Sequence, residues 1–264
     1  VPLMAKAILE RLRFLDFGSP APSKYWLTRF IFLRFLGGMY FIAFLILVNQ
    51  GLPLIGENGL LPAKNLIDIL GPRYETIFAA FLKIPTLFWF HLSDRMLVIC
   101  AWVGTILSFV VLIGFANAPI LLILWFLYMS FLHIGQTWYG FGWETQLLET
   151  GFLGIFICPL VDLRPFPRSP PPALVFWLLR WLVFRIYIGA GMIKIRGDDC
   201  WQDLTCMVYH YETQPLPNPL SPWFHFMPNW FHKFEVIWNH LTELIAPFFV
   251  FGPRPARHLA GLML

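Results

Sequence analysis

Charged side chains are scarce in this sequence. Asp, Glu, Lys and Arg make up 13% of its 264 residues, whereas hydrophobic residues make up 58%, and the mean hydropathy is +0.65. A soluble domain carries about 25% charged residues, and its core could not absorb this much apolar surface. A lipid bilayer can, because the groups that are costly in hydrocarbon are charges and unpaired backbone groups. The composition therefore excludes an ordinary soluble domain and indicates an integral membrane protein.

Motifs of soluble enzymes and of nucleic-acid-binding proteins are also missing. The sequence has no GxSxG, no Walker loop, no dinucleotide fingerprint and no HExxH. The formal net charge is +4, and the basic residues stand between apolar runs instead of forming a stripe, so we assign no nucleic-acid partner. The expected partners are membrane lipids, and we expect bound lipids but no cofactor.

What the sequence does contain is a series of long apolar runs. They are continuous, whereas the strands of a membrane barrel would alternate in polarity over about ten residues. We therefore predict an all-α transmembrane bundle with about 5 to 6 spans. This single transmembrane domain, over residues 1–264, would have its spans at about residues 27–48, 96–115, 118–133, 145–161, 173–194 and 236–251.

The two ends of the sequence give further expectations. The N-terminal stretch is basic, which predicts an interfacial helix carrying Lys6, Arg11, Arg13 and Lys24. No short apolar region is followed by a small-residue cleavage site, so the first span would act as a retained signal anchor. At the other end, residues 259–264 begin a new apolar run, and we expect the protein to continue beyond them.

Basic residues in the short connections predict the orientation. One side collects the N-terminal basic residues together with Arg164, Arg168, Arg254 and Arg257. The positive-inside rule places that side in the cytosol. The two long loops, residues 49–95 and 196–233, then face the ER lumen or the periplasm, which is an oxidising space. Within the first loop, residues 77–90 are interrupted by Lys83 and Pro85, so we expect a re-entrant or surface-lying helix there.

Charged residues inside the predicted spans are candidate functional groups, because each costs about 2.5 to 3.5 kcal/mol on insertion unless it is paired. The clearest are Glu149, Arg180 and Arg185. Positions five apart differ by about 140° around a helix, so at most one arginine can pair with Glu149. We interpret this as a structural ion pair, with a substrate or proton pathway as the alternative. Arg29 and Arg34 are expected to snorkel to the headgroups.

The four cysteines fall into two groups. Cys200 and Cys206 lie in the predicted non-cytosolic loop, where a short-loop disulfide and two reduced thiols are both open. Cys100 and Cys158 lie in predicted spans, and we expect them to be packing residues. No metal site is predicted, because the usual zinc spacing is lacking in the candidate set of Cys200, Cys206, His210 and His225.

The loop of residues 196–233 is rich in aromatic side chains and proline. Its aromatic set is too large to leave in water: Trp201, Tyr209, Tyr211, Trp223, Phe224, Phe226, Trp230 and Phe231. We predict an ordered segment that folds back over the membrane surface, because rings with polar edges prefer the headgroup region. Its surface would either contact a partner or cap the helical bundle. The candidate partner-binding residues are Trp201, Tyr209, Tyr211, Trp223 and Trp230.

Several segments carry a resemblance to a known family. Residues 189–207 read GAGMIKIRGDDCWQDLTCM, residues 210–215 read HYETQP and residues 217–219 read PNP. Supporting segments read GENGLLPA at residues 56–63, GWETQLLE at 142–149 and NHLTEL at 239–244. Together they resemble the lipase maturation factor family over nearly the whole sequence.

That resemblance implies a multi-pass membrane chaperone or assembly factor whose clients are dimeric secreted lipases, such as lipoprotein lipase. It would reside in the ER membrane of a eukaryote or in the inner membrane of a bacterium. Family members continue into a C-terminal soluble domain implicated in engaging the lipase, and we expect that domain to be absent from this sequence.

A shorter segment is similar to part of the vitamin K-dependent carboxylase. Residues 190–194, AGMIK, are followed by an acidic stretch and Trp201, and in the carboxylase the matching lysine acts as the base. This resemblance implies that Lys194 could act as a base on a lipid or quinone. The alternative is that Lys194 snorkels or pairs with Asp198 or Asp199. Two functions therefore stand beside the chaperone: a membrane enzyme built around Lys194 and a structural subunit of a larger membrane complex.

Overall fold

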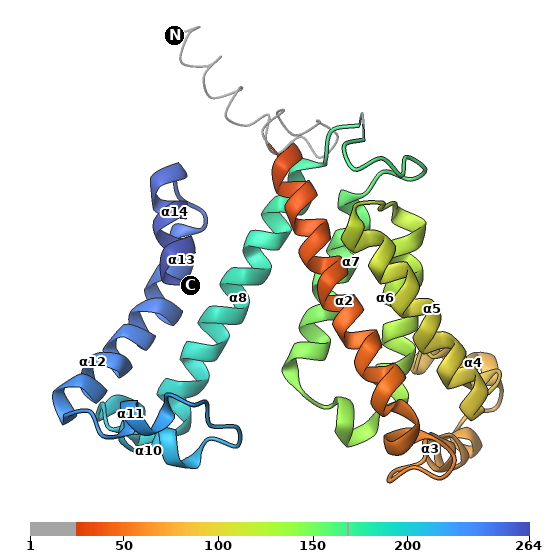
Figure 1. Cartoon of the computed structure of the whole chain (residues 1–264), viewed down its shortest axis with the longest axis horizontal. Helices are drawn as coiled ribbons and strands as arrows, with labels where there is room; N and C mark the ends of the chain where they lie inside the picture. The colour runs from red at the N-terminus through yellow and green to blue at the C-terminus, as the bar shows by residue number, and fades with distance from the viewer. Residues whose placement is uncertain (1–24, 168) are drawn as a thin grey trace, which may run out of the picture. The chain divides into compact units, whose positions relative to one another are not determined.

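The computed structural model describes residues 25–167 and 169–264, and within these ranges the chain forms helices and no strand (Figure 1). The predicted all-α class is confirmed. The interfacial helix predicted around Lys6, Arg11, Arg13 and Lys24 lies outside the described residues, as does Arg168. The chain divides into two compact units, one ending at Phe176 and the other comprising Trp177–Leu264.

Four long helices form most of the first unit: α2 (Trp26–Ile55), α5 (Asp94–Ile113), α6 (Ala118–Ile134) and α7 (Gly142–Ile157). Between α2 and α5 the chain forms α3 (Ala63–Leu70), η2 (Gly71–Arg73), α4 (Ile77–Lys83) and η3 (Leu87–Trp89), and η4 (Gln136–Tyr139) connects α6 to α7. The predicted helix of residues 77–90 is thus two short helices. Pro85 separates them, because a residue before proline disfavours the α conformation, and Ile84 has φ −130° and ψ 87°.

Close contact between α2 and α5 depends on small residues. A Cβ atom on Gly37 of α2 would lie 2.7 Å from the backbone nitrogen of Leu112 on α5, and one on Gly104 would lie 2.3 Å from the Phe44 ring. Small residues let the backbones of membrane helices approach in this way. The core beside this contact consists of fully buried rings, including Tyr40, Phe44 and Tyr128. The Phe44 and Tyr128 rings meet edge to face at 5.7 Å.

Local signals set the ends of these helices. The Ser93 side chain caps the start of α5, and the Asn117 side chain caps the start of α6. Each accepts a hydrogen bond from the backbone N–H three residues further along the chain. At its other end, α5 stops at Gly114, whose φ is +122°. The first helix continues past the predicted end at residue 48 to Ile55, where the turn starting at Gly56 stops it. The polar Asn49 does not end it, because its side chain donates to the Leu45 carbonyl within the helix.

Three of the described helices are long and apolar enough to cross a membrane, namely α2, α5 and α8 (Ala173–Gly197), while α6 is apolar but shorter. These helices support an integral membrane protein. The total of about 5 to 6 spans stays a prediction. The last predicted span, residues 236–251, falls in α12 (Asn229–His240), a π-helical turn η5 (Leu241–Ile245) and α13 (Ala246–Phe249).

In the second unit, the chain runs along α8 and then returns beside it. The returning part comprises α12, η5, α13 and α14 (Arg254–Met263). Trp177 stacks on Phe251 with ring centroids 6.2 Å apart, and Lys194 at the other end of α8 pairs with Glu243. Between the two arms, the segment after α8 folds into α9 (Asp199–Gln202), α10 (Cys206–Thr213) and α11 (Ser221–His225). Figure 1 shows α10 and α11 at the end where α8 stops and α12 begins. Residues 196–233 are thus folded into short helices, as predicted, while their place over the membrane surface stays a prediction.

Candidate functional site

The amine of Lys194, in the last turn of α8, is held by two residues of the returning arm. Its Nζ donates to Oε1 of Glu243 at 2.5 Å and to Oδ1 of Asn239 at 3.0 Å. Glu243 is only 9% exposed. The expectation that Asp198 or Asp199 pairs with Lys194 is wrong. Asp198 instead accepts a hydrogen bond from the Cys200 N–H and caps α9.

Two features of the backbone bring Glu243 to Lys194. Glu243 lies in the π-helical turn η5, and such turns are frequent at functional sites. On the opposite arm, Gly191 allows close approach, since a Cβ there would lie 2.6 Å from Leu244 Cδ2 and 3.1 Å from Glu243 Cβ. Gly191 and Lys194 are three apart and therefore share one face of α8. The ion pair is thus built into the contact between the two arms.

An open cavity of about 460 Å³ adjoins this pair. The Trp201 ring stands over the amine, with Lys194 Nζ 4.9 Å from its centroid, and His240 Nε2 lies 3.0 Å from the Trp201 carbonyl oxygen. The volume is in the range of small-molecule sites. The remaining walls are mostly aromatic or polar: Met207, His210, Phe234, Glu235, Trp238, Asn239, Thr242 and Met263.

Lys194 already holds an anionic group, the carboxylate of Glu243, beside the Trp201 ring. An ammonium has no free lone pair with which to accept a proton. A role as base would therefore require Lys194 first to lose a proton, to Glu243 or to another acceptor. That role stays a prediction.

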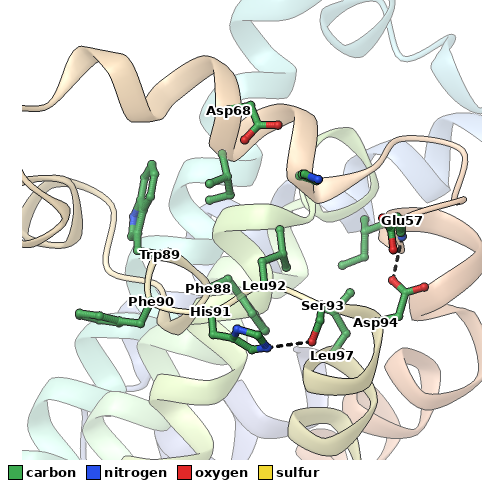
Figure 2. Close-up of a pocket in the computed structure, with 13 residues that line it drawn as sticks. Glu57, Asp68, Phe88, Trp89, Phe90, His91, Leu92, Ser93, Asp94 and Leu97 are labelled. Atoms are coloured by element: carbon green, nitrogen blue, oxygen red, sulfur yellow. Dashed lines mark hydrogen bonds between the residues drawn. The ribbon is translucent and has the colours of Figure 1, made fainter.

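A second cavity, of about 360 Å³, lies in the first unit between α3, η3 and the start of α5 (Figure 2). Figure 2 shows Asp94 facing the backbone of Glu57, whose N–H donates to Asp94 Oδ1 at 2.7 Å. The GENG turn noted in the sequence is therefore fixed to the first turn of α5. Asp68 and His91 also line this cavity, but the described residues contain no group of three or more metal-ligating side chains.

The segment of residues 198–228 is held together by a disulfide and an aromatic stack. Cys200 and Cys206 are disulfide-bonded. Tyr211 stacks on Phe224 at 5.9 Å between centroids and donates a hydrogen bond to Glu235 of α12. Burial, together with the bond to Glu235, raises the pKa of Tyr211 above its ordinary value, so the phenol stays a neutral donor.

The predicted partner-binding residues divide into two groups. Trp201 and Tyr211 make the internal contacts described above and are half-buried, whereas Tyr209, Trp223 and Trp230 are exposed. Partner contact by any of them stays a prediction. The same holds for the pairing of Glu149 on α7 with Arg180 or Arg185 on α8.

Two charged residues are buried that we did not expect to be buried from the sequence. Arg29 was expected to snorkel, but it is 2% exposed and donates to the carbonyls of Ser169 and Pro167 at 3.0 and 3.3 Å. The proline-rich loop leaves these carbonyls without ladder partners, and Arg29 supplies donors. Glu144 is 1% exposed in the first turn of α7. Glu144 belongs to the GWETQLLE segment, which supports the family resemblance, and this was the sequence signal that could have singled it out.

Together, these helices, the internal ion pair and the folded aromatic segment define a polytopic helical membrane domain. The chain belongs to the lipase maturation factor family, because residues 27–264 match the model of the lipase maturation factor transmembrane domain. It is 49% identical over 255 residues to lipase maturation factor 1 of Mus musculus, covering 93% of this chain and 44% of that protein. The corresponding human protein is 47% identical over 256 residues, again covering 93% of this chain and 45% of that protein.

A second group of relatives is more distant. Lipase maturation factor 2 of Xenopus tropicalis is 35% identical over 238 residues, which cover 86% of this chain and 33% of that protein. The chain therefore spans less than half the length of these curated relatives. No solved structure matches the chain significantly.

Proposed function

We propose that this chain is the membrane-embedded part of a factor that assists the folding or assembly of secreted lipases, acting from the ER membrane. The observation that carries this proposal is the match of residues 27–264 to the family's transmembrane domain, with relatives whose names state lipase maturation. The disulfide-bonded start of the folded segment, residues 198–213, supports it, because a protein client in the lumen would meet a structured surface there.

The test is a rescue experiment in cells that lack their own lipase maturation factor. The longer protein that contains this chain is expressed with a secreted lipase, and both the activity and the amount of secreted lipase are measured. We expect the activity per molecule of lipase to rise relative to cells that carry an empty vector. An unchanged value, with the protein present in the membrane, would contradict the proposal.

A second candidate, an enzyme that uses Lys194 as a base on a lipid or quinone, is favoured by the cavity beside that residue. Lys194→Arg separates the two functions in the rescue experiment, because arginine can keep the ion pair with Glu243 but cannot act as a base at neutral pH. Rescue by Lys194→Arg supports the maturation factor without lysine chemistry. Loss of rescue, with a normal amount of folded variant, supports the enzyme.

A further inference from the structure

Residues 216–230 of the second unit expose large apolar side chains. We call this surface the aromatic edge, and it comprises Leu216, Leu220, Trp223, Phe226 and Trp230. These residues are between 59% and 89% exposed. We propose that the aromatic edge inserts into the lipid interface of the non-cytosolic leaflet. This goes beyond the proposed function, and it assigns Trp223 and Trp230 to lipid instead of to a client protein.

Charge distribution along the segment favours lipid. From Thr213 to His232 the sequence contains no Asp, Glu, Lys or Arg. The two histidines in this stretch both face acidic residues at its flanks, since His225 lies 3.0 Å from Glu212 and His232 lies 3.1 Å from Glu235. A surface that meets only water or a polar protein rim does not need so long an uncharged stretch. A segment that inserts near hydrocarbon does need an uncharged stretch, because charged side chains are costly there.

The backbone of the aromatic edge also suits insertion. Prolines at positions 215, 217, 219, 222 and 228 have no N–H to remove from water. Other N–H groups find partners within the segment. Trp223 donates to the Leu220 carbonyl at 3.0 Å, and Phe226 donates to the Pro222 carbonyl at 3.3 Å. Internal partners of this kind lower the cost of moving a backbone into lipid.

Polar side chains inside the turn complete this arrangement. The Ser221 hydroxyl is buried and accepts hydrogen bonds from the Gln214 side chain at 2.7 Å and from the Asn218 N–H at 3.0 Å. The Asn218 side chain in turn accepts from the Leu220 N–H at 2.8 Å. These polar groups of the turn therefore have partners within it, although Asn218 itself is exposed, and its large apolar side chains are left outside.

The position of the segment puts the aromatic edge near the bilayer surface. Helix α8 has 25 residues, a length of about 37 Å, which exceeds the hydrocarbon thickness of about 30 Å. The segment begins directly after α8, and its other end leads into α12, which returns along α8 toward Phe251. Both attachments hold it at the membrane end of the two arms, where tryptophan and other aromatic residues gather in membrane proteins.

The segment has internal contacts that do not involve the aromatic edge. The disulfide between Cys200 and Cys206 and the stack of Tyr211 on Phe224 lie on its inner side. Beside the aromatic edge runs an open groove of about 530 Å³, whose walls include Pro217, Pro219 and Phe226. Glu212 and His225 also line this groove, so we place lipid against the aromatic edge and not in the groove.

The test reads the depth of one residue in a bilayer. In the full chain, the free cysteines Cys100 and Cys158 are replaced by alanine, and a single cysteine is introduced as Phe226→Cys. The label is a thiol-reactive, environment-sensitive fluorophore, and the protein is reconstituted in phosphatidylcholine nanodiscs. Thr213→Cys is the matched control, because Thr213 is exposed in the same segment and stands beside the charged Glu212.

One quencher in the lipid and one in the buffer show whether lipid or water surrounds each label. We expect the label at position 226 to be quenched by phosphatidylcholine carrying a nitroxide on its acyl chain, consistent with a depth of about 5 to 10 Å below the headgroup surface. Iodide in the buffer should quench the label at position 213 more strongly than the label at 226. Strong quenching by iodide at 226 without quenching by lipid would overturn the proposal and leave the edge free for a client protein. Quenching by neither would show that the label is covered by protein and would also overturn it.

A second position protects the test against a local effect of the substitution. Trp223→Cys is labelled in the same way, and each variant is compared by thermal unfolding with the parent that lacks Cys100 and Cys158 but keeps the Cys200–Cys206 disulfide. We expect both positions to report lipid. If position 226 reports lipid but 223 reports water, insertion of the edge as a unit is wrong.

Discussion

Lys194 and Glu243 are 49 positions apart in the sequence but share a short hydrogen bond. Removal of either partner leaves the other charge with too few partners in a largely buried site. We expect Lys194→Met and Glu243→Leu each to lower the free energy of unfolding by about 2 to 4 kcal/mol, which corresponds to a Tm lower by roughly 5 to 15 °C. Thermal unfolding in detergent micelles measures this change.

The control for these variants is Lys233→Met, which removes an exposed lysine from α12 and should change Tm little. The double variant Lys194→Met with Glu243→Leu should lose less than the sum of the two single variants, because it removes both charges together. Additive losses would mean that the two residues act independently, contrary to the observed contact.

The sequence identified Lys194 as a residue of interest but named the wrong acidic partners. Asp198 and Asp199 are its near neighbours, and short-range reasoning favours them. The actual partner depends on the return of the chain through η5, which no local pattern indicates. Arg29 shows the same limit, since its carbonyl partners at Ser169 and Pro167 come from a loop that follows α7.

At the scale of helix packing, two adjacent glycines of α2 differ in how closely they approach α5. A Cβ on Gly37 would meet the backbone of α5 at 2.7 Å, whereas one on Gly38 would make an ordinary contact of 3.6 Å with a Leu112 methyl group. We expect Gly37→Ala to lower stability by about 1 to 3 kcal/mol through overpacking, partly offset by the better helix propensity of alanine. Gly38→Ala should be neutral or stabilising. Thermal unfolding of the two variants side by side decides this, and equal Tm values would contradict the close contact.

Long apolar helices could be predicted from the sequence because composition and length decide them almost alone. The spans predicted at 27–48 and 173–194 fall within helices that are apolar enough to cross a membrane, and the span predicted at 96–115 matches such a helix except for its last two residues. The helix boundaries were harder to place. Asn49 stays inside α2 through a bond to its own helix, and Pro85 divides a short apolar run into two helices. The first outcome depends on a hydrogen bond within the helix and the second on the backbone conformation that proline imposes on Ile84, and average hydropathy reports neither.

The predicted orientation of the whole chain in the membrane can be tested at residues of the second unit. Helix α8 is continuous over 25 residues, and the contact of Trp177 with Phe251 brings Arg254 and Arg257 back to the end where α8 starts. We therefore expect cysteines introduced as Arg168→Cys and Arg257→Cys to be labelled from the cytosolic side. A cysteine introduced as Thr213→Cys should be labelled from the opposite side. A membrane-impermeant thiol reagent, applied to sealed vesicles and then to opened ones, measures this.

The orientation would be wrong if positions 213 and 257 were labelled from the same side. It cannot be read from the residues of the ion pair or the cavities, because the positive-inside rule concerns only the charges of short connections. The family could be identified from short motifs spread along the sequence, while the cavity beside Lys194 could not, because its walls come from α8, the segment after it, α12 and η5.

The π-helical turn η5 also acts as a phase shift in the returning arm. A turn of this kind holds one residue more than an α-helical turn, and one residue corresponds to about 100° of rotation around a helix axis. Everything after η5 is therefore rotated relative to α12. The side chain of Glu243 lies in the turn itself, and the Phe251 ring lies beyond it. We expect deletion of a single residue before Glu243 to rotate both relative to α12, so that the ion pair near one end of α8 and the aromatic stack near the other would be lost together.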